Sequence, residues 1–169
     1  MLALGQPLHA FDAATLQGDI VVRRARAGEK LTTLDGVERD LDPEDVVICD
    51  DSGVISLAGI MGGATTEVGD ATTDILLEAA TWDPLAVFRG NRRHKLSSEA
   101  GKRFERTVDP AVARAALARA AALLVEIAGG TVEPTLTDIV VPTEPVSIRM
   151  DIDLPDRIAG VTYPNGTAA

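Results

Sequence analysis

The chain has 169 residues, about one domain's worth, and its 46% hydrophobic and 25% charged content is typical of a globular protein rather than a disordered one. Its formal net charge of −10 argues against broad electrostatic binding of nucleic acid, including duplex DNA. The single cysteine, Cys49, excludes an internal disulfide. The sequence shows no signal peptide and no apolar run of the ~20 residues needed to span a bilayer. These features predict a cytoplasmic protein that is not bound to a membrane.

The first half of the chain is predicted to form short strands joined by tight turns. Residues 19–25 are rich in β-branched side chains, and Asp35-Gly36 separates two short apolar segments in the manner of a hairpin turn. Two further strands are expected at 46–49 and 54–58, with "DDSG" as the turn between them. The run "TDILLEAA" (73–80) is another candidate strand.

The second half is predicted to be helical. A short helix is expected at 84–90, and a long alanine- and leucine-rich helix at 110–128, capped by Asp109 and stopped by Gly129-Gly130. Strands followed by a packed helix indicate an α+β fold with mainly antiparallel strands packed against helices. From about residue 137 prolines and turn signals become frequent, which indicates a linker that leads into a further unit.

Few residues in the first half have side chains suited to chemistry, and each has a structural alternative. His9, in "GQPLHAFD", is either a packed ring near a turn or a group that handles substrate. Gly59, Gly62 and Gly63 follow a predicted strand, where they serve either a sharp turn or the close approach of a ligand to the backbone. Glu78 interrupts an apolar strand and either faces solvent or is a buried carboxylate that needs a partner.

A second group of candidate residues lies between residues 89 and 106. Seven Lys and Arg residues stand there against two Glu residues, which forms either a solvated helix with ion pairs or a patch that holds one phosphate-bearing end. Ser97, Ser98, Ala100 and Gly101 are small, so they leave room for a ligand, although a serine here also suits a helix N-cap. Two histidines and one cysteine at distant positions do not make a structural zinc site, and no nucleophile motif or P-loop is present.

Five blocks of sequence, taken in order and spacing, are more specific than any single motif. They are "LGQPLHAFDAATLQG", "GEKLTTLDGVERDL", "VVICDDSGVISLAGIMGG", "ILLEAA" and "RRHKLSSEAGKRFERTVDPA". Over about residues 1–136 they resemble the B3/B4 editing module of bacterial phenylalanyl-tRNA synthetase β subunits. The tail "VSIRMDIDLPDRIAGVTYP", within 137–169, is similar to the beginning of the next module, B5. The resemblance implies that the N-terminal part of the B3/B4 module lies outside this sequence.

The resemblance implies an editing activity. In that family the module hydrolyses tyrosine that has been mischarged onto tRNA(Phe), because a phenylalanine pocket cannot strongly reject a molecule that merely adds a hydroxyl. Carried over by position, Glu78 would receive the tyrosine hydroxyl, and His9 would transfer a proton or orient the water. Gly62, Ser98 and Ala100 would line the pocket. The basic patch, with Arg92, Arg93, Lys95 and Arg103, would hold the single-stranded 3′ end of the tRNA.

The same resemblance implies partners and cofactors outside the chain. The partners are tRNA(Phe) and the α subunit of an (αβ)₂ heterotetramer, and the whole synthetase uses ATP and Mg²⁺, neither of which is expected to bind this part. The alternative function is a non-catalytic RNA-binding or subunit-scaffold module. Three positions depart from the usual family pattern: Ser98 replaces threonine, Gly101 replaces serine and Thr107 replaces glycine. Ser98 keeps the hydroxyl, whereas Thr107 is expected to alter a turn before the long helix.

Overall fold

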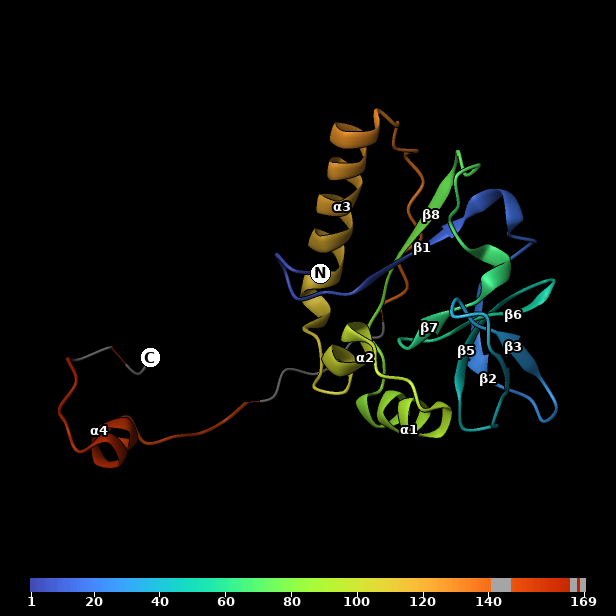
Figure 1. Cartoon of the computed structure of the whole chain (residues 1–169). Coiled ribbons are helices and arrows are strands. Elements are labelled where there is room, and N and C mark those ends of the chain that lie inside the picture. The colour runs from blue at the N-terminus through green and yellow to red at the C-terminus, as the bar shows by residue number, and fades with distance from the viewer. Residues whose placement is uncertain (141–146, 165–166, 168–169) are drawn as a thin grey trace. The chain divides into compact units, whose positions relative to one another are not determined.

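The computed structural model describes residues 1–140, 147–164 and 167, shown in Figure 1. Its internal contacts divide the chain into two units, Met1–Val132 and Glu133–Ala169. The second unit contains the short helix α4 (Leu154–Ala159). The predicted linker from residue 137 lies partly outside the described residues, which omit 141–146.

The first unit combines antiparallel strands with helices, which confirms the α+β prediction. Its strands are β1 (Leu8–Asp12), β2 (Val21–Arg24), β3 (Lys30–Thr32), β4 (Glu38–Asp40), β5 (Val46–Asp50), β6 (Gly53–Leu57), β7 (Met61–Gly62) and β8 (Ile75–Ala79). Its α-helices are α1 (Pro84–His94), α2 (Glu99–Phe104) and α3 (Ala113–Ala128).

The strands form three antiparallel sheets. The largest has the order β2-β5-β6-β7, and the pairs β1-β8 and β3-β4 form two-stranded ribbons. The predicted turns are present: Gly36 has a φ of +77° between β3 and β4, and residues 51 and 52 join β5 to β6. Glycine at position 36 is favoured because it adopts positive φ without a Cβ clash.

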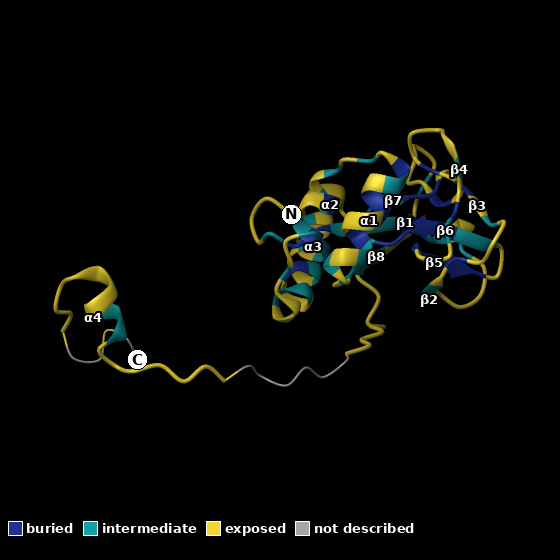
Figure 2. Cartoon of the chain, turned by 90° about the horizontal axis from the view of Figure 1, so that it is seen from below, coloured by how far each residue is buried: buried dark blue, intermediate teal, exposed yellow. Residues whose placement is uncertain are grey.

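The core lies on the central strands β5 and β6, which Figure 2 shows in dark blue. Val47, Ile55 and Leu57 are each at most 1% exposed, and Phe11 of β1 is buried to the same degree. Cys49 packs among these aliphatic side chains, as expected for a small buried hydrophobe. Burial of both faces of β5 and β6 explains why their sequences lack a clear alternation of apolar and polar residues.

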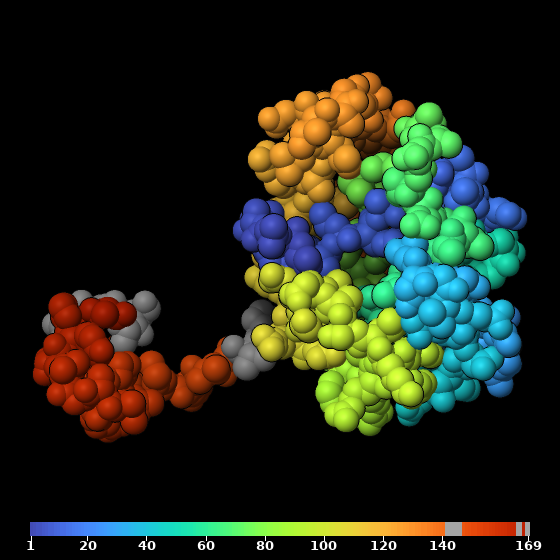
Figure 3. All heavy atoms as spheres, viewed as in Figure 1, coloured from blue at the N-terminus to red at the C-terminus, as the bar shows by residue number. Residues whose placement is uncertain are grey.

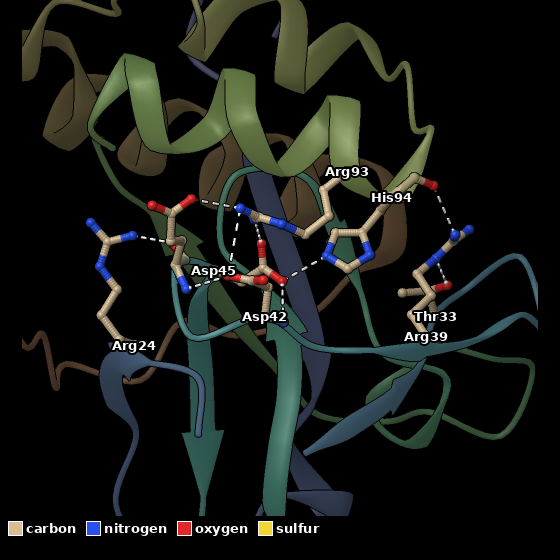
Figure 4. Close-up of polar contacts among 8 residues, drawn as sticks. Arg24, Thr33, Arg39, Asp42, Asp45, Arg93 and His94 are labelled. Carbon is tan, nitrogen blue, oxygen red and sulfur yellow. Dashed lines mark hydrogen bonds and ion pairs between the residues drawn. The ribbon is translucent and has the colours of Figure 1, made fainter. Parts of the chain in front are cut away.

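Helix α1 is held on the sheet by a buried carboxylate, shown in Figure 4. Asp45 precedes β5 and is 2% exposed; its Oδ1 accepts from the Arg93 guanidinium, and its Oδ2 lies 2.7 Å from Nε2 of His94. Oδ2 also accepts from the backbone N–H of Asp42 at 2.9 Å. Arg39 of β4 adds a second link, because it donates to the His94 carbonyl at 3.0 Å.

Helix α3 ends where the sequence predicts, but it begins at Ala113, three residues after the predicted start at 110. The Asp109 side chain accepts from the N–H of Ala111 before a 3₁₀ turn at Pro110–Val112, and Gly129 ends the helix with a φ of +71°. The helix packs beside β8 (Figure 1), with Ala116 as its buried residue. Thr107, in the connection from α2, has a φ of +69°. A β-branched residue is strained in this conformation, which explains the preference for glycine that the family resemblance implies here.

We expect Asp45→Asn to lower the free energy of unfolding by about 3 kcal/mol, because it removes one partner of a buried ionic cluster. Urea unfolding of the chain measures this loss. Asp40→Asn is the matched control, since the Asp40 side chain is 88% exposed and lies 3.4 Å from Lys30. The control should change stability by less than about 0.5 kcal/mol. Equal effects of the two substitutions would show that Asp45 does not anchor α1.

Thr107→Gly should raise the free energy of unfolding by about 1 kcal/mol, since relief of the left-handed strain exceeds the added entropy of the unfolded chain. Thr81 is also exposed, but its φ is not positive. Thr81→Gly should therefore destabilise the chain by roughly 0.5–1 kcal/mol. Urea unfolding of both variants tests the contrast, and a destabilised Thr107→Gly would mean that the turn is not strained.

Candidate functional site

The β1–β8 ribbon brings together two residues that are 69 positions apart in sequence. In its antiparallel register His9 of β1 lies opposite Glu78 of β8. Directly opposite residues project on the same face of a two-stranded ribbon, and their Cβ atoms are about 4.5–5.5 Å apart. The two side chains predicted to carry the chemistry therefore share one face.

That face borders a small cavity, named here the β1–β8 cavity, with a volume of about 70 Å³. By the ~10–15 Å³ that one water requires, this space holds several water molecules or a small ring. Its polar side chains are His9, Ser56 and Glu78. Most of the remaining wall is apolar and comes from Leu57, Ile60, Met61, Trp82 and Phe104. A mostly apolar wall with a few placed polar groups is typical of a small-molecule site.

Gly62, on β7, allows the His9 ring to occupy its position. A Cβ added at Gly62 would lie 2.5 Å from Cε1 and 2.8 Å from Nε2 of His9. Both distances are well inside van der Waals contact, so any other residue here would displace the ring. Gly62 therefore lines the cavity, and its lack of a side chain has a steric reason; its role in substrate binding stays a prediction. Gly59 serves the turn between β6 and β7, with a φ of +69°.

Glu78 is the unusual group in the cavity. Its Oε2 is buried and has no hydrogen-bond partner among the described residues. Burial raises the pKa of this carboxyl to about 7, because removal from water disfavours the charged form. Glu78 as a whole is half-buried, and its Oε2 does not face solvent. An unpaired buried carboxyl oxygen costs stability, and a hydroxyl or N–H group placed in the cavity would supply the missing hydrogen bond.

His9 is held as a neutral ring near physiological pH. Burial lowers the pKa of His9 below its usual value of 6.5. Its ring packs edge-to-face on Phe11, with the ring centroids 4.4 Å apart and an interplanar angle of 82°. No hydrogen bond joins the ring nitrogens of His9 to the described residues. A neutral imidazole can accept a proton or orient a water.

Two small residues in and before α2, Ser98 and Ala100, were predicted to line the pocket. Ala100 lines the cavity and Ser98 does not. Ser98 caps α2 instead: its hydroxyl accepts from the N–H of Gly101 at 2.9 Å and donates to the Ile60 carbonyl at 3.2 Å. Its role in substrate binding stays a prediction. Gly101 packs against α1, where a Cβ would lie 2.5 Å from Nδ2 of Asn91. Close contact between α1 and α2 thus explains glycine at this position.

The predicted basic patch separates into engaged and free side chains. Arg93 is paired with Glu44 at 2.7 Å and with Asp42 and Asp45, so the geometry gives no support to an RNA contact for it. Arg92 lies over the Phe88 ring, 5.5 Å from its centroid. The side chains of Lys95 and Arg103 make no ion pair with the residues that the structure describes. The roles of Arg92, Lys95 and Arg103 in RNA binding remain predictions.

The sequence analysis missed several residues that build the site. Gln6 is fully buried, and its amide donates to the Ala80 carbonyl at 2.9 Å, which ties the entry of β1 to the end of β8. Trp82 and Phe104 supply aromatic walls, and Ser56 lies on the cavity side of β6. The one sequence signal for these residues is Trp82, the only tryptophan, four positions after Glu78.

The described residues contain no group of three or more His, Cys, Asp or Glu side chains arranged to hold a metal ion. Within the same residues, no helix has both the length and the apolar character needed to cross a membrane.

The raised pKa of Glu78 predicts a pH-dependent stability. Its folded pKa of about 7 exceeds the usual 4.5, so its contribution is fully present below pH 4.5 and is lost as the pH rises through 7. Between pH 4.5 and pH 8 the loss should reach about 3 kcal/mol. Glu78→Gln should remove this dependence, as measured by urea unfolding of variant and wild type at each pH.

Glu126 of α3 is exposed, so Glu126→Gln serves as the control and should follow the wild-type pH profile. A Glu78→Gln profile parallel to that of the wild type would show that Glu78 is not buried in the folded chain.

Comparison with known proteins identifies relatives of this chain. A protein of Nocardia farcinica named phenylalanine–tRNA ligase beta subunit is 73% identical over an alignment that covers 100% of this chain and 20% of that protein. Proteins of the same name from Corynebacterium glutamicum and Streptomyces avermitilis are 59% and 56% identical, each over 96% of this chain and 20% of their own length. The chain thus spans about a fifth of the length of the curated relatives it matches.

The B3/4 domain family matches residues 1–129. This range takes in every residue that lines the β1–β8 cavity, together with the strands and helices that position them. The match covers most of the sequence, and the chain belongs to the B3/4 domain family.

Proposed function

We propose that this chain is the editing part of a phenylalanine–tRNA ligase β subunit and that its cavity hydrolyses tyrosine mischarged onto tRNA(Phe). The observation that carries the proposal is the buried Oε2 of Glu78, which has no hydrogen-bond partner among the residues described and lies beside a mostly apolar cavity. The high identity to proteins named phenylalanine–tRNA ligase beta subunit supports the part of the proposal that places this chain in such a subunit.

The Glu78 carboxyl would select tyrosine by its hydroxyl. A phenolic O–H placed in the cavity supplies the hydrogen bond that Oε2 lacks, whereas the ring of phenylalanine leaves Oε2 buried and unpaired. Leaving such a group unsatisfied costs about 1–3 kcal/mol, which corresponds to roughly 5- to 150-fold in favour of tyrosine. This preference is opposite to that of a phenylalanine-binding site, as an editing site requires.

Ester hydrolysis would need positioning more than strong activation. The oxygen of a water attacks the carbonyl carbon, the bond from that carbon to the ribose oxygen breaks, and the ribose oxygen takes a proton. Neutral His9 supports this step, because its free ring nitrogens can orient the water and accept its proton. Gly62 contributes by leaving room for the ring, and correct placement of ester and water supplies much of the rate.

The same proposal implies partners, a cellular location and cofactors for the whole ligase. The partners would be tRNA(Phe) and the α subunit of an (αβ)₂ ligase, acting in the cytoplasm where translation takes place. Residues 137–169 would begin the next module, B5. ATP and Mg²⁺ would serve the ligase reaction of the whole enzyme, and we assign no residue of this chain to either.

In the full ligase, Glu78→Ala should lower the ratio of kcat/KM for Tyr-tRNA(Phe) over Phe-tRNA(Phe) deacylation to about 1, because the hydroxyl loses its partner. His9→Ala should reduce kcat for both substrates by about 10²-fold, the lower end of general acid–base contributions. Release of labelled amino acid from each charged tRNA measures both effects.

Glu126→Ala, a substitution at an exposed position of α3, is the control; it should change neither the kcat/KM ratio of the two charged tRNAs nor kcat. Aminoacylation with phenylalanine should survive in all three variants. Unchanged tyrosine clearance in folded Glu78→Ala and His9→Ala enzymes would instead favour the non-catalytic scaffold module.

A further inference from the structure

A second cavity of about 410 Å³ lies on the other side of α2 from the β1–β8 cavity. We name it the α2 groove; Leu4 and Gly5 of the N-terminal segment form one wall, and Lys102, Arg103, Arg106 and Thr107 form another. Figure 3 shows the N-terminal residues (blue) lying against the surface of the residues near 100–112 (yellow). Ala100 and Phe104 of the same helix face the β1–β8 cavity.

The α2 groove contains three cationic side chains, those of Lys102, Arg103 and Arg106, and two acidic ones, those of Glu99 and Asp109. Lys102 is paired with Glu99 at 2.8 Å, and the Asp109 carboxylate accepts from the N–H of Ala111. Arg103 and Arg106 form no ion pair with the described residues, although their charges, after the hydrogen bond from Lys102, help to lower the pKa of Glu99. The groove therefore contains two guanidinium groups available to an anion.

Arg103 is also placed for a ligand rather than for solvent alone. Its Nε is buried without a hydrogen-bond partner in the described part of the chain, and its Nη1 lies 3.9 Å from the point that a Cβ on Gly5 would occupy. A buried guanidinium N–H without an acceptor is costly in the same way as the unpaired Oε2 of Glu78. Planar guanidinium groups match the oxygens of a phosphate in a two-bond geometry.

We propose that the α2 groove binds a backbone phosphate of the single-stranded 3′ end of the aminoacyl-tRNA, held by Arg103 and Arg106. The inference rests on the proposed editing function, because it places the acyl group in the β1–β8 cavity on the opposite side of α2. A helix with its side chains is about 10–12 Å across, so the last nucleotides of one strand span both cavities. Single-stranded RNA needs few such contacts, which fits two free arginines on an acidic protein.

The test compares two tyrosyl esters in the full ligase: Tyr-tRNA(Phe), and 3′-O-tyrosyl-adenosine, which carries no phosphate. Arg106→Gln and the double variant Arg103→Gln/Arg106→Gln should raise KM for Tyr-tRNA(Phe) by about ten-fold per arginine without a change in kcat. Hydrolysis of tyrosyl-adenosine should stay at the wild-type rate. The slope of log kcat/KM against log salt should weaken by about 0.7 in the double variant, because the groove neutralises one phosphate.

Arg26→Gln is the charge-matched control, because Arg26 is exposed and lies outside both cavities. An equal loss of both substrates, or no loss with Tyr-tRNA(Phe), overturns the phosphate site. Arg106 is exposed, so its single variant tests the site even if replacement of Arg103 unfolds the protein.

A failure of the editing proposal can be distinguished from a failure of the phosphate-site proposal. If the wild-type enzyme hydrolyses neither ester, binding of the trinucleotide CCA by equilibrium dialysis still tests the groove. The double variant should bind CCA more weakly by at least ten-fold, and equal binding to wild type and variant would overturn the proposal.

Discussion

The antiparallel register of β1 against β8 is the constraint on which the candidate site depends. Because side chains alternate along a strand, a slip of one residue would move His9 and Glu78 to opposite faces. Side-chain hydrogen bonds fix the register at both ends of the ribbon. Gln6 donates to the Ala80 carbonyl at one end, and Thr72 donates to Asp12 at 2.7 Å at the other. The cavity is therefore assembled by backbone pairing and kept in place by two polar clamps.

The second constraint is the attachment of α1, which determines where α2 lies. Asp45 and Arg39 hold the C-terminal end of α1 on the sheet, and the glycine at 101 lets α2 pack closely on Asn91 of α1. The short helix α2 then presents Ala100 to one cavity and Arg103 to the other. The ionic cluster around Asp45 is thus structural, but it positions the groups that we propose contact the acyl ester and the RNA.

Local patterns were enough to predict most elements of the fold. The Asp35-Gly36 turn, the Asp109 cap and the Gly129 stop each depend on neighbouring residues, and each is present in the structure. The orientation of Glu78 could not be predicted from its strand, because it is set by pairing with β1, 69 residues away. The engagement of Arg93 depends likewise on Asp45, 48 residues away, so a count of charges could not separate it from Arg103. The strain at Thr107 cannot be read from its neighbours, and only the family resemblance, in which glycine is usual at this position, predicted an altered turn here.

The most direct test of the account is a crystal structure of the full ligase with a non-hydrolysable analogue, 3′-amino-3′-deoxyadenosine joined to tyrosine through an amide. The account predicts that the tyrosine ring enters the β1–β8 cavity and that its phenolic oxygen lies about 2.5–3.0 Å from Oε2 of Glu78. A ring that enters the cavity with its hydroxyl directed away from Glu78, or an analogue that leaves the cavity empty, would contradict the account.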